Sequence, residues 1–361
     1  MLKLYSTPPG DQVSIINNQN FKSMNNSNPS GVFHGVHDIR VDEKEAPVIN
    51  ENSIIVKVEM TGICGTDLHI YHEGLVPEGS VLGHEFCGEI IEKGSKVKDL
   101  NVGERVVINP MENGIGLGVS PGGFARYVKI DNAEKNTNTF SIPDSVNSEK
   151  GALIEPFSVG LAAINKTNLT KEDSVLVTGC GTIGLVTIAG LKSKGIKNII
   201  ASDISDKRLE LAKQLGANYT FNPSSDDKLD DLIINNFGTV NSLNYAGELP
   251  NLNAAFECSG VGAVFSQSVN LLAPDGSLTI LAIYSKELSL DPNLVVYKRL
   301  NILGSLFYTP NDFIEAIDLM ASGEVDLSPI VSHHFPLDEL PKAFETQADS
   351  RKSVKVIVDS I

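Results

Sequence analysis

Two short segments of the chain carry side chains that can bind a metal ion. Gly62–His69 reads Gly-Ile-Cys-Gly-Thr-Asp-Leu-His, and Gly83–Glu85 reads Gly-His-Glu. Cysteine, histidine and glutamate all belong to the ligand set that zinc accepts. However, a Gly-His-Glu triplet by itself is also typical of an ordinary turn. From the spacing alone, a zinc site and a pair of structural turns therefore both stay open.

A glycine-rich segment further along has the pattern of a dinucleotide-binding loop. Residues 179–184 read Gly-Cys-Gly-Thr-Ile-Gly, which matches G-x-G-x-x-G. An apolar strand is expected just before it at Ser174–Thr178, and Ile183–Lys194 has helical spacing. Asp203 follows Gly184 by nineteen residues, at the end of the next expected strand. Strand, loop, helix and acid together predict a Rossmann-type cofactor site rather than an isolated glycine turn.

Each position of this loop has a physical task in cofactor binding. Gly179 permits the tight turn, Gly181 lets the backbone approach a pyrophosphate, and Gly184 lets the helix pack against the strand. Thr182 and Ile183 lie where the expected helix begins, and the free N–H groups and positive dipole end of that helix attract phosphates. The alternative is a glycine-rich turn in a Rossmann fold that binds another ligand.

Asp203 bears on which nicotinamide cofactor is used. Its carboxylate can accept hydrogen bonds from the adenosine ribose hydroxyls, and it would repel a 2′-phosphate. The sequence therefore favours NAD over NADP. Arg208 is close in sequence and is also a candidate cofactor-binding residue, which leaves NADP as the alternative.

The pattern of predicted secondary structure differs between two parts of the chain. From Val32 to about Pro156, short β-type runs such as Ile54–Val58 and Arg105–Ile108 alternate with Gly/Pro turns, as in an all-β region. From Ser174 to about Ala282, apolar strands alternate with helical stretches, which is typical of βαβ units and a parallel sheet.

Further elements are expected on the same grounds. Strands are expected at Asn198–Ser202, Ala254–Cys258 and Ser277–Ala282, and a helix capped by Asp206 at Asp206–Leu215. In the tail, Pro310–Asp312 opens a helix whose apolar stripe is Phe313, Ile314, Ile317 and Met320, and Ser353–Val358 alternates like a half-buried strand.

Composition excludes several classes of protein. The length of 361 residues suggests two domains, and the net charge of -16 argues against a nucleic-acid or anionic-membrane partner. Met1–Leu4 begins no apolar signal region, and no apolar run is long enough to cross a bilayer. None of the four cysteines forms a CxxC pair. A cytoplasmic protein with reduced thiols is therefore expected.

From about Val32 to the C-terminus the chain resembles the zinc-dependent medium-chain alcohol dehydrogenase family. The motifs that carry the resemblance occur in the family's order: Gly62–His69, Gly83–Gly88, Glu155-Pro156, Gly179–Gly184 and Asp203.

The resemblance implies an α/β protein in which a β-rich, GroES-like catalytic domain is interrupted by a Rossmann domain. The catalytic zinc-binding domain is expected at residues 31–157 and 296–361, and the NAD-binding Rossmann domain at 158–295. Residues 1–30, rich in Asn, Ser and Pro, are expected to be an N-terminal extension, either a flexible leader or a peripheral addition.

The resemblance also implies a set of zinc ligands. Cys64 and His84 match ligand positions, and Glu85 matches a ligand or exchanging ligand. Where some members place a second cysteine, this chain has Glu155, as in the polyol, butanediol and threonine branch. Whether Glu85, Glu155 or both contact zinc stays open.

A single catalytic zinc per chain is expected. Many family members hold a structural zinc on four cysteines in a lobe that falls between Arg105 and Phe124 here, and this chain has no cysteine in that segment.

Proton transfer is implied for two further residues. Thr66 and His69 match the family's proton relay, in which the alcohol proton passes to the hydroxyl and leaves through the histidine. Glu155 is counted with them as a catalytic candidate, and Asp67 is expected to orient a ligand histidine by a hydrogen bond. The alternatives are turn-forming roles for Thr66 and Asp67 and an ordinary surface position for His69.

The resulting hypothesis is a zinc- and NAD-dependent dehydrogenase that oxidises a secondary alcohol. Leu303–Thr309, followed by Asp312-Phe313, is similar to butanediol dehydrogenases, which favours a small vicinal diol such as 2,3-butanediol. Sorbitol-like polyols and L-threonine are the competing substrates. A zinc-free reductase and a non-catalytic nucleotide-binding protein are alternatives of other kinds. The resemblance also implies a homodimer or homotetramer.

Overall fold

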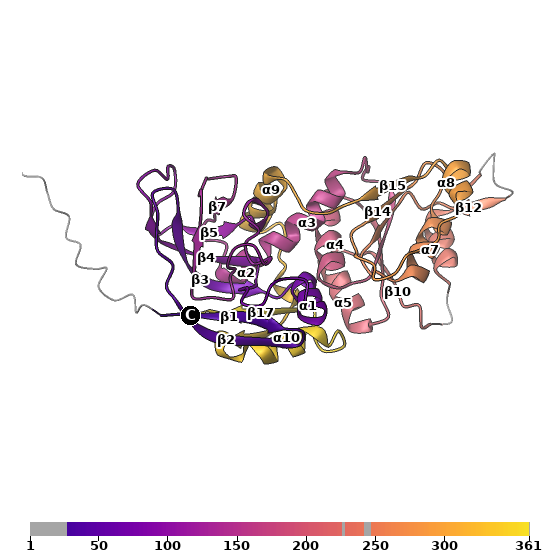
Figure 1. Ribbon diagram of the computed structural model, residues 1–361. Helices are drawn as coiled ribbons and strands as arrows, with labels where there is room; N and C mark the ends of the chain where they lie inside the picture. The colour runs from indigo at the N-terminus through magenta and orange to yellow at the C-terminus, as the bar shows by residue number, and fades with distance from the viewer. Residues whose placement is uncertain (1–26, 226–227, 242–246, 361) are drawn as a thin grey trace, which may run out of the picture.

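The computed structural model describes residues 27–225, 228–241 and 247–360. Two large sheets lie at opposite ends of the molecule, with helices between and around them (Figure 1). The chain builds most of the first sheet, leaves it for the second, and returns to add two last strands. This confirms the expected α/β class, in which one β-rich unit is interrupted by another.

The first sheet has seven strands and is mainly antiparallel. Its order is β16-β17-β3-β4-β5-β7, and β6 also pairs with β3. Gly62 on β3 lies opposite Glu85 on β4, and Ile357 on β17 lies opposite Gly62 from the other side. Three segments distant in sequence therefore meet at one place. The bounds are β3 Ile54–Gly62, β4 Glu85–Lys93, β5 Arg105–Ile108, β6 Tyr127–Ile130, β7 Thr139–Ser141, β16 Val331–Pro336 and β17 Lys355–Asp359.

The second sheet is parallel and has six strands in the order β10-β9-β8-β13-β14-β15. The order reverses between β8 and β13, and such switch points are where open α/β sheets bind ligands at the carboxyl ends of their strands. The bounds are β8 Ser174–Thr178, β9 Asn198–Ser202, β10 Tyr219–Phe221, β13 Ala254–Glu257, β14 Ser277–Ile280 and β15 Asn301–Gly304.

Two helices join the sheets through a common core. Phe157 on α3 and Phe313 on α9 are fully buried in one apolar cluster with Phe140 of the first sheet and Val177 of the second. In Figure 1, α3 and α9 lie between the sheets. The principal helices are α1 Gly65–Glu73, α2 Ser148–Ala152, α3 Ile154–Asn165, α4 Thr182–Ser193, α5 Asp206–Leu215, α6 Leu229–Phe237, α7 Gly262–Leu271, α8 Pro292–Lys298, α9 Pro310–Ala321 and α10 Leu340–Ala348.

Two further antiparallel strand pairs lie in the part of the chain that the structure describes. They pair β1 Ser27–Gly35 with β2 Asp38–Glu45, and β11 Thr239–Asn241 with β12 Glu248–Pro250. Among the helices of the described residues, none combines the length and apolar character needed to cross a membrane.

Several elements differ from the sequence-based expectations at their ends. Residues 1–26 of the expected extension lie outside the described residues, whereas Ser27–Ser30 belong to strand β1. The Rossmann domain is expected to end at residue 295, and β15, which lies after that residue, pairs with β14 in the parallel sheet. The domain boundaries themselves stay predictions.

The expected cap of α5 is also corrected. Ser205, not Asp206, is the N-cap residue, and Asp206 is the first residue of the helix, where its carboxylate accepts a hydrogen bond from Asn222.

The packing of the cofactor loop predicts that an alanine is tolerated at one of its glycines and not at another. A Cβ at Gly184 would lie 1.8 Å from the carbonyl oxygen of Gly179, whereas the nearest heavy atom to a Cβ at Gly181 is 4.0 Å away. Gly184→Ala should therefore lower the free energy of unfolding by about 1–3 kcal/mol or more, and Gly181→Ala should leave it almost unchanged. Urea unfolding of both variants measures this, and equal stabilities would contradict the packing argument.

Candidate active site

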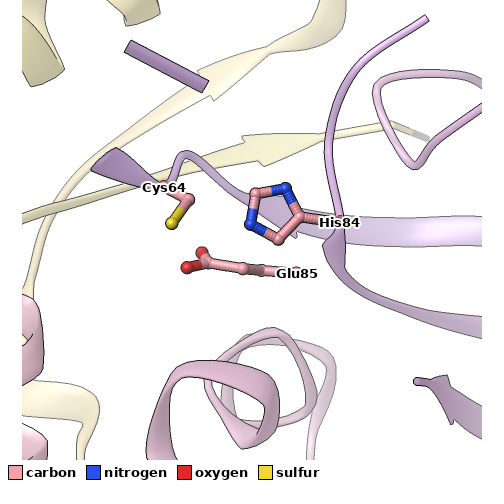
Figure 2. Close-up of side chains that lie close together, drawn as sticks. All are labelled: Cys64, His84 and Glu85. Atoms are coloured by element: carbon pink, nitrogen blue, oxygen red, sulfur yellow. The ribbon is translucent and has the colours of Figure 1, made fainter. Parts of the chain in front are cut away.

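Three side chains with metal-binding atoms converge where β3 and β4 meet α1. One ligand atom from each of Cys64, His84 and Glu85 lies within 4.8 Å of the other two. Figure 2 shows the sulfur, one ring nitrogen and the carboxylate turned toward a common space. His84 and Glu85 are buried, and Cys64 is half-buried. The structure therefore brings together three of the four expected ligands.

Glycines make this convergence possible. A Cβ at Gly62 would lie 2.3 Å from Glu85 Oε2, so a larger residue would displace the carboxylate. Gly83 has a φ of +92°, and a Cβ there would lie 2.8 Å from the backbone nitrogen of Phe124. The two interpretations of Gly83–Glu85 are thus compatible, because the segment is a glycine turn and also presents His84 and Glu85.

Asp67, on α1, lies close to two members of the cluster, Cys64 and His84. Its Oδ2 accepts a hydrogen bond of 2.9 Å from the backbone nitrogen of Cys64. Its Oδ1 lies 3.6 Å from Nδ1 of His84, which is longer than a hydrogen bond, so the expected Asp67–histidine hydrogen bond is not formed. Both of these buried atoms lack a hydrogen-bond partner within the described part of the chain.

The chemistry of this donor set fits a zinc ion. Burial by itself would lower the pKa of His84, but the charges of Asp67 and Cys64 outweigh it and raise that pKa well above its ordinary value. The site thus stabilises positive charge at the place where a cation would bind. A thiolate, an imidazole and a carboxylate together are suitable zinc ligands.

Lys355 is a member of this cluster that the sequence analysis missed. Its Nζ lies 2.5 Å from Glu85 Oε2 and donates a 3.1 Å hydrogen bond to the carbonyl oxygen of Ile63. Burial would lower the pKa of Lys355, but the charges of Glu85 and Cys64 outweigh burial and raise it. The sequence feature that could have indicated a buried lysine is the position of Lys355 within the otherwise apolar run Val354–Val358.

Glu155, the fourth expected ligand, lies on α3 outside the three-residue cluster. Its Oε1 accepts a 2.8 Å hydrogen bond from the hydroxyl of Tyr308, which follows β15. Burial raises the pKa of Glu155 to about 7, with His84 lowering it and Glu85 raising it. Glu155 thus interacts electrostatically with His84 and Glu85, and its contact with zinc stays a prediction.

The two relay candidates lie on α1, directly after Cys64. Thr66 is half-buried, whereas His69 is exposed and its Nδ1 lies 3.1 Å from Glu73 Oε1. A half-buried residue two positions after Cys64 and an exposed residue one helical turn further on are compatible with a proton path. The relay itself stays a prediction.

Four of the seven cofactor candidates line a cleft at the carboxyl ends of β8, β9 and β13, whereas Thr182, Ile183 and Gly184 are not among its lining residues. This cleft has a volume of about 820 Å³, and its lining includes Gly179, Gly181, Asp203, Arg208 and Cys258. Gly179 has a φ of +82°, as its expected turn requires.

Asp203 and Arg208 both have partners within the protein. Asp203 Oδ2 accepts a 2.7 Å hydrogen bond from the backbone nitrogen of Cys180, so it also holds the glycine loop in place. Arg208 Nη2 donates to the carbonyl oxygens of Ser350 (2.9 Å) and Ser353 (3.1 Å). The loop also contacts this segment, because Thr182 donates to the carbonyl oxygen of Val354. Thr182 is the first residue of α4, and Ile183 and Gly184 follow it in the first turn.

Comparison with known families agrees with this architecture. Residues 50–144 match the alcohol dehydrogenase GroES-like domain, and residues 182–322 match the zinc-binding dehydrogenase domain.

Relatives with names and structures cover nearly the whole chain. An L-threonine 3-dehydrogenase of Alteromonas mediterranea is 32% identical, over 89% of this chain and 96% of its own length. The crystal structure of 2R,3R-butanediol dehydrogenase from Bacillus subtilis has a TM-score of 0.83 at 30% identity, covering 93% of this chain and 100% of that one. A zinc-binding dehydrogenase from Sinorhizobium meliloti bound to NADP has a TM-score of 0.81 at 28% identity, covering 92% and 99%.

Fold and matches together define an oxidoreductase that acts on CH–OH groups. The chain belongs to the zinc-dependent medium-chain alcohol dehydrogenase family. The expected family, fold class and enzyme class are thereby confirmed, and a non-catalytic nucleotide-binding role is not supported.

The raised pKa of Glu155 predicts that Glu155 lowers the free energy of unfolding of the metal-free protein more strongly as the pH rises. A buried carboxyl whose pKa rises from 4.5 to about 7 costs nothing at low pH, and it destabilises the fold increasingly as the pH rises through that range. Glu155→Gln removes the charge, so the free energy of unfolding of the variant minus that of the wild type should grow by about 2–3 kcal/mol between roughly pH 5 and pH 8.

Urea unfolding at several pH values in the presence of a chelator measures this difference. Glu287→Gln serves as a control, because it removes the same charge from an exposed position. A Glu155→Gln difference that stays constant with pH would contradict the assignment.

Proposed function

We propose that the chain is a zinc- and NAD-dependent dehydrogenase that oxidises a secondary alcohol, with a small vicinal diol such as 2,3-butanediol as the favoured substrate. The observation that carries the proposal is the convergence of Cys64, His84 and Glu85 in the same chain as the glycine-loop cleft. The likeness to a butanediol dehydrogenase structure supports the choice of substrate.

In this proposal Cys64 and His84 hold zinc, together with a carboxylate from Glu85, Glu155 or both. The bound ion supplies a Lewis acid that lowers the pKa of the alcohol. Thr66 accepts the alcohol proton and His69 releases it to solvent. The glycine loop and Asp203 orient the nicotinamide cofactor that receives the hydride.

The residues around the site favour an uncharged diol over an amino acid. Glu85 and Glu155 are acidic, and the amine of Lys355 is already paired with Glu85. Apart from the zinc ion, these groups therefore include no unpaired cation for the carboxylate of an amino acid. L-threonine and sorbitol-like polyols stay the alternatives, because relatives named L-threonine 3-dehydrogenase are among those most similar to this chain.

NAD is proposed over NADP because Asp203 lies in the cleft, where its charge would repel a 2′-phosphate. Arg208 would favour NADP, but its guanidinium already donates to two backbone carbonyls. The NADP-bound relative keeps NADP as the competing assignment.

The remaining proposals concern stoichiometry and setting. A single zinc per chain is proposed because residues 105–124 contain no cysteine. All four cysteines are free thiols, which is typical of a reducing compartment and supports a cytoplasmic location. A homodimer or homotetramer, acting on a small alcohol without a nucleic-acid or membrane partner, completes the proposal.

A substrate screen tests the proposed reaction. NADH formation should be fastest with a 2,3-butanediol stereoisomer, with kcat/KM at least about tenfold above sorbitol, xylitol, L-threonine and simple secondary alcohols. Cys64→Ser is the matched control, which should lose turnover and still bind NADH. A clear preference for L-threonine or a polyol would overturn the proposed substrate.

Cofactor preference is tested at Asp203. Asp203→Ala removes the charge that would repel a 2′-phosphate, so the ratio of NADPH to NADH dissociation constants should fall by about tenfold, or about 1.4 kcal/mol. Asp206→Ala removes an equal charge nearby and should leave the ratio unchanged. Titration by cofactor fluorescence gives both constants, and an unchanged ratio in Asp203→Ala would remove this residue from cofactor selection.

A further inference from the structure

A fully buried lysine lies in contact with a candidate zinc ligand. Lys355, on β17, has a relative exposure of 1%, and its amine reaches the carboxylate of Glu85 and the carbonyl oxygen of Ile63. Burying an ammonium group is unfavourable unless it is paired and hydrogen-bonded. The chain therefore maintains a costly charge at this position, directly beside the ligand cluster.

Glu85 is shared between this lysine and the cluster. A ligand atom of Glu85 lies within 4.8 Å of those of Cys64 and His84, while Oε2 contacts Lys355 Nζ at 2.5 Å. Lys355 and a metal ion would therefore compete for one carboxylate. Glu155 has a different partner, because its Oε1 accepts the hydrogen bond from Tyr308.

Charge balance gives the lysine a definite role. Cys64, Asp67, Glu85 and Glu155 are the acidic groups at or beside the site, and together they can exceed the two positive charges of a zinc ion. The ammonium group of Lys355 supplies one further positive charge, and it lies on Glu85. Without the lysine, Glu85 would lose this cationic partner and would be free to turn toward the ion.

We propose that Lys355 is a positioning residue that holds Glu85 beside the zinc ion rather than on it. A catalytic zinc site needs one coordination position left open for substrate, and restraining Glu85 keeps that position available. The inference rests on the zinc site of the proposed function, and it is independent of which alcohol is oxidised.

Four variants of the full-length protein test the proposal: Lys355→Met, Lys355→Arg, Glu85→Gln and the double variant Lys355→Met/Glu85→Gln. Two measurements that need no turnover are made on each, the visible absorption spectrum of the Co²⁺-substituted protein and the zinc affinity in competition with a chelator. Lys298→Met is a matched control, because Lys298 is equally buried but bonds to carbonyl oxygens of the α7 segment.

Lys355→Met should alter the cobalt spectrum and bind zinc more tightly, because it frees Glu85 to become a ligand. Groups that orient metal ligands change the affinity by about 10- to 100-fold when they are replaced, and an effect of that size is expected here in the direction of tighter binding. Lys355→Arg should retain the wild-type spectrum. The double variant should have the spectrum of Glu85→Gln, because the lysine acts through Glu85. Lys298→Met should change neither measurement.

An unchanged spectrum in Lys355→Met, weaker zinc binding, or the same spectral change in both backgrounds would overturn the proposal. If Lys355→Met does not fold, Lys355→Gln replaces it, since its amide can still donate hydrogen bonds without a charge. Wild-type protein that binds no cobalt or zinc would defeat the zinc site as well. Protein that gives the expected spectra but oxidises no diol would defeat only the proposed substrate.

Discussion

The antiparallel register of β3 and β4 is the constraint on which the candidate active site depends. Gly62, at the end of β3, lies opposite Glu85, at the start of β4. Cys64, which follows β3, is therefore close to the first residues of β4. A shift of one residue would turn Glu85 to the other face of the sheet. The close approach of the Glu85 carboxylate to Gly62 would add a second penalty if any larger residue stood there.

The last strand connects this site to the cofactor cleft. The segment just before β17 accepts hydrogen bonds from Arg208 and from Thr182 of the glycine loop, and β17 then places Lys355 against Glu85. Residues that return to the first sheet only at the end of the chain thus contact both halves of the proposed machinery. The shared core around α3 and α9 holds those halves together.

Much of this arrangement is predictable from the sequence, and the exceptions have physical reasons. The strands at Arg105–Ile108 and Ser174–Thr178 have the expected ends, because turn residues or the glycine loop bound them. Lys355 was missed because alternation in Ser353–Val358 suggests one solvent-facing side, whereas every residue from Lys355 to Val358 is buried. Its partner Glu85 is distant in sequence, so no local pattern indicates the pair.

The central claim is that Cys64 and His84, with a neighbouring carboxylate, bind one catalytic zinc ion. Metal analysis of purified wild-type protein and Cys64→Ser tests it most directly. We expect about one zinc per wild-type chain and close to none in the variant, because loss of the thiolate removes a principal ligand. About two zinc ions per chain, or equal zinc in both proteins, would contradict it.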